Sequence, residues 1–285
     1  MKHARLSLVT AALLGMMSTS YAYAAEEAAA PAPEAAPAEP ASDFTLTTNI
    51  GFFGQYVFRG ITYTNDRPAV QGGFDLAHSS GAYLGVWGTN VDKDALYGNT
   101  LEVDLYGGFA NTIGDTDFGY DFGFLYFYYP DNDKPINITD GRRTESPNTL
   151  EVSAAGSWKW FTLKYSYAVT DFFGINNKSF GKDIGLGEGD TDGSDYIELN
   201  FNYTLPMAIN LTLHAGHQRV EGHSMGDYDD YLIGISKDFS VFNSDGWTAG
   251  LNYTTTSGAD DDWYVDAKGR ETSDDHVILY LMRTF

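Results

Sequence analysis

The chain has 285 residues, with 39 acidic and 17 basic side chains and a formal net charge of −22. This balance argues against nucleic acid as a partner, because binding to phosphates needs clustered lysine and arginine. With no cysteine, the chain has no disulfide framework, cysteine zinc site or cysteine nucleophile. The composition that a fold must explain is the excess of aromatic residues and glycine, with 20 Tyr, 18 Phe and 31 Gly.

The first 42 residues predict export. In residues 1–24, Lys2 and Arg5 precede a short apolar stretch, and Ala22-Tyr23-Ala24 is a small-x-small cleavage pattern, so we predict a cleaved secretory signal peptide. The stretch is too short for a membrane anchor, and no run of 18 apolar residues follows it. Residues 25–42 contain only Ala, Pro, Glu and a final Ser and predict an extended periplasmic linker.

From Phe44 onward, apolar and polar residues alternate with period two, and Gly, Asn and Asp cluster between the alternating segments. In residues 117–128 every second side chain is aromatic, which gives one continuous aromatic face. Residues 43–285 are therefore expected to form one all-β domain with an even number of strands. The predicted strands lie at residues 44–58, 68–78, 82–91, 100–110, 117–129, 149–158, 160–171, 195–205, 208–219, 228–238, 246–256 and 276–285.

The lengths of the connections alternate. Every second connection is short, as at Ser79-Ser80-Gly81 and Pro206-Met207, whereas several of the others are long, at 130–148, 172–194 and 257–275. A soluble β-sandwich does not require this alternation. We therefore predict a transmembrane antiparallel up-and-down β-barrel of about 12 strands, with short periplasmic turns and longer extracellular loops, in the outer membrane of a Gram-negative cell.

The end of the sequence supports the same location. Phe285 shares the phase of Val277, Leu279 and Leu281, and this resembles the C-terminal signal of proteins that the outer-membrane assembly machinery inserts. Arg283 stands where that signal usually has an aromatic residue. The alternative is an ordinary last strand that ends in Phe. The expected partners are this machinery, outer-membrane lipid and lipopolysaccharide, and small solutes.

Four segments together resemble the TorF family of outer-membrane porins. They are residues 55–61 (QYVFRGI), 68–75 (PAVQGGFD), 81–92 (GAYLGVWGTNVD) and 102–109 (EVDLYGGF). The resemblance implies passive transport across the outer membrane. The linker and the acidic loop at 181–195 depart from the family pattern, so the resemblance implies no particular solute.

If the apolar phase of each strand faces lipid, the other phase lines the lumen. An acidic lining concentrates cations and repels anions, which predicts a narrow, cation-preferring channel. The alternative is that these carboxylates pair with the bases inside a plugged barrel. For Arg59 we expect either a clamp on neighbouring carboxylates, with Asp75 as a possible partner, or contact with an anionic solute. The predicted lining residues are Arg59, Asp75, Glu102, Asp104, Asp121, Glu151, Lys164 and Glu198.

Aromatic residues in the lipid-facing phase predict the two interfacial girdles of a membrane barrel. In the lumen phase, Tyr106 and Tyr196 are the main aromatic candidates, which is too few for a sugar-binding track. The predicted girdle residues are Tyr83, Trp87, Trp158, Tyr167, Trp247 and Tyr253.

Other polar motifs are weak. The acidic run at 190–195 lacks the bidentate Glu of an EF-hand loop and fits a solvated rim better than a calcium site. His214 and His217 point to opposite faces of a strand, so they cannot share a metal without ligands from elsewhere. The adjacent pair His223-Ser224 does not place a base on a nucleophile. We expect no metal, cofactor or catalytic residue.

The main hypothesis is a porin, and the alternative is a structural or adhesive barrel with a blocked pore. Solute, gating and oligomeric state stay open.

Overall fold

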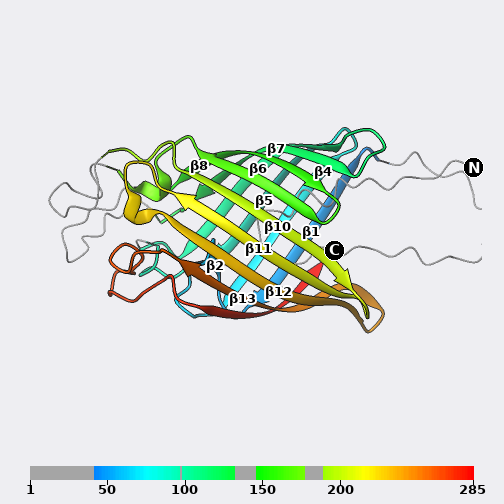
Figure 1. The fold of residues 1–285 in the computed structure, drawn as a ribbon. Coiled ribbons are helices and arrows are strands. Elements are labelled where there is room, and N and C mark those ends of the chain that lie inside the picture. The colour runs from blue at the N-terminus through cyan, green and yellow to red at the C-terminus, as the bar shows by residue number, and fades with distance from the viewer. Residues whose placement is uncertain (1–41, 97, 132–145, 177–188) are drawn as a thin grey trace, which may run out of the picture.

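A computed structural model describes residues 42–96, 98–131, 146–176 and 189–285. The predicted signal peptide, and the predicted linker up to residue 41, lie outside these residues. Twelve strands of the described residues close into one antiparallel barrel (Figure 1). They are β1 (Phe44–Phe53), β4 (Ala69–His78), β5 (Ala82–Asn90), β6 (Leu101–Thr112), β7 (Phe118–Tyr128), β8 (Thr149–Trp158), β9 (Phe161–Ala168), β10 (Asp195–Leu205), β11 (Ile209–Arg219), β12 (Tyr228–Val241), β13 (Ser244–Ser257) and β14 (His276–Thr284).

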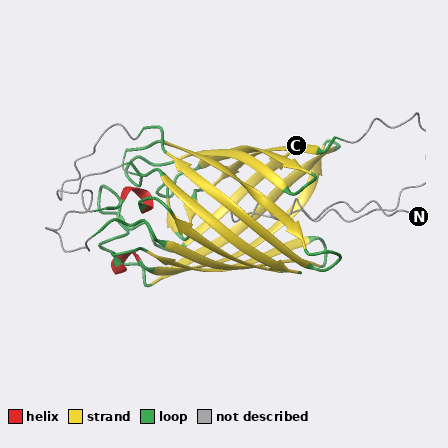
Figure 2. Cartoon of the chain, turned by 90° about the horizontal axis from the view of Figure 1, so that it is seen from above, coloured by secondary structure: helices red, strands yellow, loops and turns green. Residues whose placement is uncertain are grey.

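Each strand pairs with its neighbours in chain order, and β1 closes the barrel by pairing with both β4 and β14. One end of the barrel carries short turns, where Lys159, Met207 and Phe242 adopt the left-handed backbone that tight hairpins need. The longer connections lie at the other end, together with the 3-10 turns η1 (Phe172–Gly174) and η3 (Ser224–Gly226) (Figure 2). The predicted all-β up-and-down barrel of about 12 strands is confirmed.

The barrel has an apolar outer face and a polar interior. On β6, for example, Leu101 and Leu105 are 41% and 45% exposed on the outside, whereas Glu102 and Asp104 face inward and are buried. This exposure pattern is the reverse of a soluble core, because most large apolar side chains lie on the surface. None of the helices in the described residues is long and apolar enough to cross a membrane.

The predicted strand bounds are correct to within a few residues, with one large exception. The first strand was expected to span 44–58, but β1 ends at Phe53. At Gly54 the chain leaves the wall and turns into the lumen, where β2 (Val57–Phe58) and β3 (Ile61–Thr62) form a short hairpin. The alternation continues through this segment because the hairpin is itself made of strands, and so the pattern does not reveal where the wall ends.

Candidate functional site

The inward hairpin, residues 54–64, is the main feature of the lumen. Arg59 and Gly60 form its tip with φ angles of 48° and 79°, the left-handed pair of a tight hairpin turn. A Cβ on Gly60 would lie 2.6 Å from Thr256 Cγ2 on β13 and 3.0 Å from Asp230 Cβ on β12. In the closed strand order β13 and β12 lie two and three strands from β1, so the tip contacts a part of the wall away from the strand that the hairpin leaves.

Arg59 fixes the hairpin tip to the opposite wall. Its guanidinium donates two hydrogen bonds to Glu151 on β8, at 2.9 and 2.8 Å, and one to Gln218 on β11, at 3.0 Å. It also stacks on the ring of Tyr196, with 4.0 Å from Cζ to the ring centroid, and its own carbonyl accepts a hydrogen bond from Tyr228. The predicted clamp therefore exists, but its carboxylate is Glu151, and the suggested pairing with Asp75 is wrong because Asp75 lies on another part of the wall.

Aromatic side chains fill the space around the hairpin. Phe58 packs edge to face on Phe127 of β7, with ring centroids 5.4 Å apart, and also on Phe173 of η1. Tyr56 packs on Trp87 of β5 at 5.6 Å. These rings come from β5, β7 and the η1 turn, and together with the hairpin they form a core inside the end that carries the long loops.

Two of the predicted lining acids lie in this filled region. Glu102 is fully buried and accepts hydrogen bonds from the hydroxyls of Tyr56, at 2.8 Å, and Tyr129, at 2.6 Å. Asp104 is 3% exposed, and its Oδ1 is buried with no hydrogen-bond partner among the described residues. Both side chains face inward and are buried in this filled region.

Towards the short turns the lumen is polar. Asp75 accepts a hydrogen bond from Tyr106, and Asp121 accepts bonds from the Tyr83 hydroxyl at 2.9 and 3.1 Å. Each of these tyrosines reaches across one intervening strand to its carboxylate. A Cβ on Gly85 would lie 2.3 Å from the ring of Tyr106, so this glycine lets the ring lie flat against the wall.

The same arrangement recurs around the barrel. A Cβ on Gly216 would lie 2.0 Å from the Tyr196 hydroxyl, and one on Gly250 would lie 2.2 Å from the ring of Tyr280. Part of the excess of Gly and Tyr is thereby explained, because a strand glycine opposite a tyrosine accommodates a large side chain without filling the lumen.

A polar network connects the two regions. Lys164 on β9 lies 3.8 Å from Glu198 on β10, and Asn200 donates to Glu198 at 2.8 Å. His214 on β11 then connects Asn200 with Asp230 on β12, and both contacts are within hydrogen-bond distance. The predicted lining residues Lys164 and Glu198 are thus neighbours.

Sequence reasoning missed two inward carboxylates, Asp230 and Asp238 on β12. Tyr231, Ile233 and Ile235 are exposed on the outer face, so both aspartates belong to the opposite phase. That series of apolar residues on one face of β12 is the sequence signal that could have placed both aspartates on the inward face. The adjacent pair Asp229-Asp230 hid it, since one acid of this pair faces out and the other in.

The girdle prediction is wrong for two of its six residues. Tyr83 and Trp87 are 8% and 4% exposed and face the lumen. Both phases of β5 carry apolar residues, so hydrophobicity alone could not assign the lipid-facing side. The other four lie on the outer face: Trp158, Tyr167 and Tyr253 are at least 40% exposed, and Trp247 is half-buried. Their role at the two membrane interfaces stays a prediction.

Charged loops meet around the mouth of the barrel at the end that carries the long connections. Lys93 and Lys268 bind Asp94 at 2.6 and 2.5 Å, and these bonds lower the pKa of the Asp94 carboxyl to about 2. Arg270 binds Asp266 in the same cluster. Burial alone would raise the pKa of the Asp266 carboxyl, but its hydrogen bonds with Arg270 and Lys268 outweigh burial and lower the pKa below its usual value. Loop residues around 91–100 and 258–275 are thereby joined.

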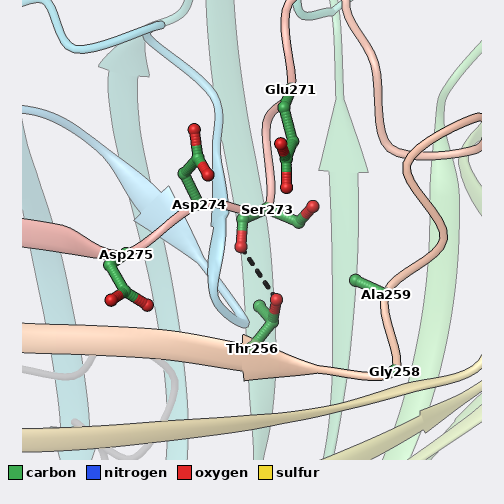
Figure 3. Close-up of a pocket in the computed structure, with 7 residues that line it drawn as sticks. All are labelled: Thr256, Gly258, Ala259, Glu271, Ser273, Asp274 and Asp275. Atoms are coloured by element: carbon green, nitrogen blue, oxygen red, sulfur yellow. Dashed lines mark hydrogen bonds between the residues drawn. The ribbon is translucent and has the colours of Figure 1, made fainter.

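A shallow hollow of about 480 Å³ lies beside this mouth (Figure 3). Thr256 donates a hydrogen bond to the carbonyl of Ser273 at its floor, at 2.8 Å. Glu271, Asp274 and Asp275 also line it, so the hollow is acidic.

Comparison with known proteins gives a family but no curated relative. A family model described as "Bacterial protein of unknown function (Gcw_chp)" matches residues 37–285. No curated protein matches the chain. Neither this description nor the solved structures below carry the TorF name, so the expected membership of that family is not supported.

Several solved structures have a similar fold. A KdgM porin matches at TM-score 0.49 and 7% identity over 84% of this chain and 99% of its own. The COG4313 outer membrane channel from Pseudomonas putida F1 matches at 0.45 and 11% identity over 87% and 100%. The outer membrane protein opdK from Pseudomonas aeruginosa matches at 0.37 and 10% identity over 87% and 68%. At such identities and scores, function has to be argued from the barrel itself.

Proposed function

The chain belongs to the Gcw_chp family of bacterial proteins of unknown function, and we propose that it is an outer-membrane porin through which small solutes diffuse passively, with a preference for cations. The single observation that carries the proposal is the closed barrel with its apolar outer face and polar interior. In a membrane such a barrel satisfies every strand hydrogen bond and leaves no free edge, and its inward polar phase offers a hydrated route.

The charge of the lumen supports the preference for cations. In the strands and the hairpin that the structure describes, eight carboxylates face inward, whereas the inward Lys and Arg side chains are Lys164 and Arg59. An excess of fixed negative charge in a confined pore raises the local cation concentration. The carboxylates are Asp75, Glu102, Asp104, Asp121, Glu151, Glu198, Asp230 and Asp238.

Location in the outer membrane follows from the same features. An exported chain with a predicted signal peptide and linker would present the short turns to the periplasm and the long loops to the exterior. The lipid, lipopolysaccharide and assembly machinery named above are the partners that such a protein would meet. No described feature favours catalysis.

One observation favours a second candidate, the structural or adhesive barrel with a blocked pore. The hairpin crosses the lumen, Arg59 is 8% exposed in its clamp with Glu151, and the surrounding rings are buried. In this conformation the end with the long loops is filled. A porin therefore needs either a narrow route beside the hairpin or movement of the hairpin.

A tethered hairpin separates these possibilities, because the chain has no cysteine of its own. We suggest Gly60→Cys with Thr256→Cys, whose side chains would meet at the hairpin tip, and each single variant as control. Ion current through planar bilayers is recorded before and after reduction, and the reversal potential in a KCl gradient gives the ion preference. Equal current in both states places the route beside the hairpin. Current only after reduction means that the hairpin moves.

Two results together would reject the porin function. The first is that the wild-type barrel carries no current, and the second is that it admits no small sugar or salt into proteoliposomes, although its heat-modifiable migration on gels shows that it is folded. In that case the blocked barrel is the better description. A reversal potential on the anion side would reject the cation preference alone.

A further inference from the structure

We propose that His214 is a cation within the lumen and is the residue that sets how strongly the channel prefers cations as pH changes. This inference rests on the proposed porin function and deepens it. It starts from hydrogen bonding: both nitrogens of the ring face groups that can only accept.

The Nδ1 side is determined by Asn200. Its amide nitrogen donates to the Glu198 carboxylate at 2.8 Å, which fixes the orientation of the amide, since a carboxylate accepts and does not donate. The amide oxygen of Asn200 therefore faces His214 Nδ1 at 2.8 Å, and the nearest Glu198 oxygen lies 3.6 Å from the same nitrogen. Nδ1 must carry a hydrogen to satisfy this contact.

The Nε2 side is determined by Asp230. Its Oδ2 accepts the hydroxyl hydrogen of Tyr196 at 2.7 Å, and its Oδ1 lies 2.9 Å from His214 Nε2. The Tyr196 oxygen is also 2.9 Å from Nε2, but its hydrogen is already given to Asp230, so it too acts as an acceptor. Nε2 must also carry a hydrogen. A ring with hydrogen on both nitrogens is the imidazolium cation.

The charges around the ring favour this state. Glu198 on β10 and Asp230 on β12 flank it, and both are buried, at 8% and 2% exposed. Lys164 on β9 pairs with Glu198. The positive charge of Arg59 on the hairpin disfavours a positive charge on the His214 ring, but the carboxylate of Glu151 already neutralises Arg59. With His214 charged, the two carboxylates of this group are balanced by two cations.

Loss of the proton from His214 leaves this group with one uncompensated negative charge. Histidine is the side chain that ordinarily changes charge between about pH 5 and 8. The ring lies where the filled end of the lumen meets the polar end, with the partly exposed Asn202 and Thr212 further towards the short turns. A solute that passes this level must pass His214, so its charge bears directly on ion preference.

The test is the reversal potential in a KCl gradient, measured from about pH 5 to 8. We expect the permeability ratio of K⁺ to Cl⁻ in the wild type to rise severalfold with pH. His214→Gln is expected to show the high-pH ratio throughout. His217→Gln is the matched control, because His217 lies on the same strand but is 50% exposed on the outer face, paired with Asp229. It should behave as wild type.

A second lumen histidine gives the rival explanation. His276 on β14 is 4% exposed and lies 3.4 Å from Asp66. If His276→Gln abolishes the pH dependence, or if His214→Gln retains it, the inference is overturned. Absence of current in the wild type and in every variant would reject the porin function itself. The charge of His214 is then tested by a direct measurement that does not need current.

That measurement is NMR of the detergent-solubilised barrel with isotopically labelled histidine. The His214 signals are identified by their loss in His214→Gln. At neutral pH we expect the chemical shifts of a doubly protonated ring. Shifts of a single neutral tautomer would overturn the inference, whether or not the barrel conducts.

Discussion

The two ends of the lumen share the same wall of twelve strands but differ in what occupies the space inside. Towards the long loops, the half-buried Phe58 of the hairpin and the buried rings of Phe127 and Phe173 make a core. Towards the short turns, tyrosines such as Tyr106 lie flat over strand glycines and leave polar side chains around the lumen. Strand number therefore does not fix the open width of this barrel. The path of one connection and the placement of small residues do.

The difference between the ends also divides the charges by role. Arg59, Glu151 and Glu102 are buried and bonded, so they hold the hairpin in place. Asp75 and Asp121 are bonded to tyrosines along the wall and stay beside the lumen. Closure is therefore expected to depend on the first group, and ion preference on the second group together with the network of His214.

The largest effect is expected when the clamp is broken. Arg59→Ala leaves Glu151 buried without its counter-charge, which should cost about 3–5 kcal/mol. Without the clamp the hairpin should leave the lumen, so the filled end should open and the single-channel conductance should rise above that of the wild type. Stability is measured by the urea midpoint for unfolding from lipid vesicles, and Arg59→Lys, which keeps the charge without the forked contact, should lose less.

A double variant tests whether the loss comes from the pair. Arg59→Ala combined with Glu151→Gln should be more stable than the sum of the two single losses predicts, because no buried charge is left alone. Simple additivity would show that the clamp does not hold the hairpin.

The next effect concerns the hairpin tip. Gly60→Ala places a methyl group 2.6 Å from Thr256 Cγ2 at a φ of 79°, and we expect a loss of about 1–3 kcal/mol from strain and contact together. Gly258→Ala is the matched control, since Gly258 has the same φ of 79° with nothing within 4 Å of its Cβ position. Adding Thr256→Ser should relieve part of the Gly60→Ala loss. Equal losses at the two glycines would mean that the tip does not reach β13.

The wall could be predicted from sequence, whereas the contents of the lumen could not. Alternation and connection length locate the strands because each depends on neighbouring residues. The hairpin depends on Arg59 meeting Glu151, which is 92 residues away, and nothing local records that contact. Trp87 was misassigned for a related reason: whether an aromatic side chain faces in depends on partners across the lumen, such as Tyr56.

At the polar end, Gly85→Ala tests whether a glycine keeps the lumen open. The new methyl group would lie 2.3 Å from the Tyr106 ring, so the ring must swing into the lumen and lose its bond to Asp75. We expect lower conductance and a loss of about 1–2 kcal/mol. Gly156→Ala, in a strand position with nothing within 4 Å, should change neither. Unchanged conductance in Gly85→Ala would mean that the polar end does not limit current.

The smallest effect is expected at the mouth with the long loops, where loop charges cover the filled end. The pKa of Asp94 is lowered to about 2 by Lys268 and Lys93, so its stabilising contribution is complete above the unfolded carboxyl pKa of about 3.9 and is lost as pH falls towards 2. Because both lysines are more than half exposed, Asp94→Asn should cost at most about 1 kcal/mol at neutral pH.

The measurement is the temperature at which migration on gels changes, at neutral pH and near pH 2. The difference between Asp94→Asn and wild type should disappear at the acidic value, because the wild-type carboxyl then approaches protonation. Asp262→Asn, an exposed change in the loop that carries Lys268, is the control and should have no effect at either pH. A loss that persists in acid would assign Asp94 a role other than its ion pairs. The filled end would then depend on the loops above it as well as on the hairpin inside it.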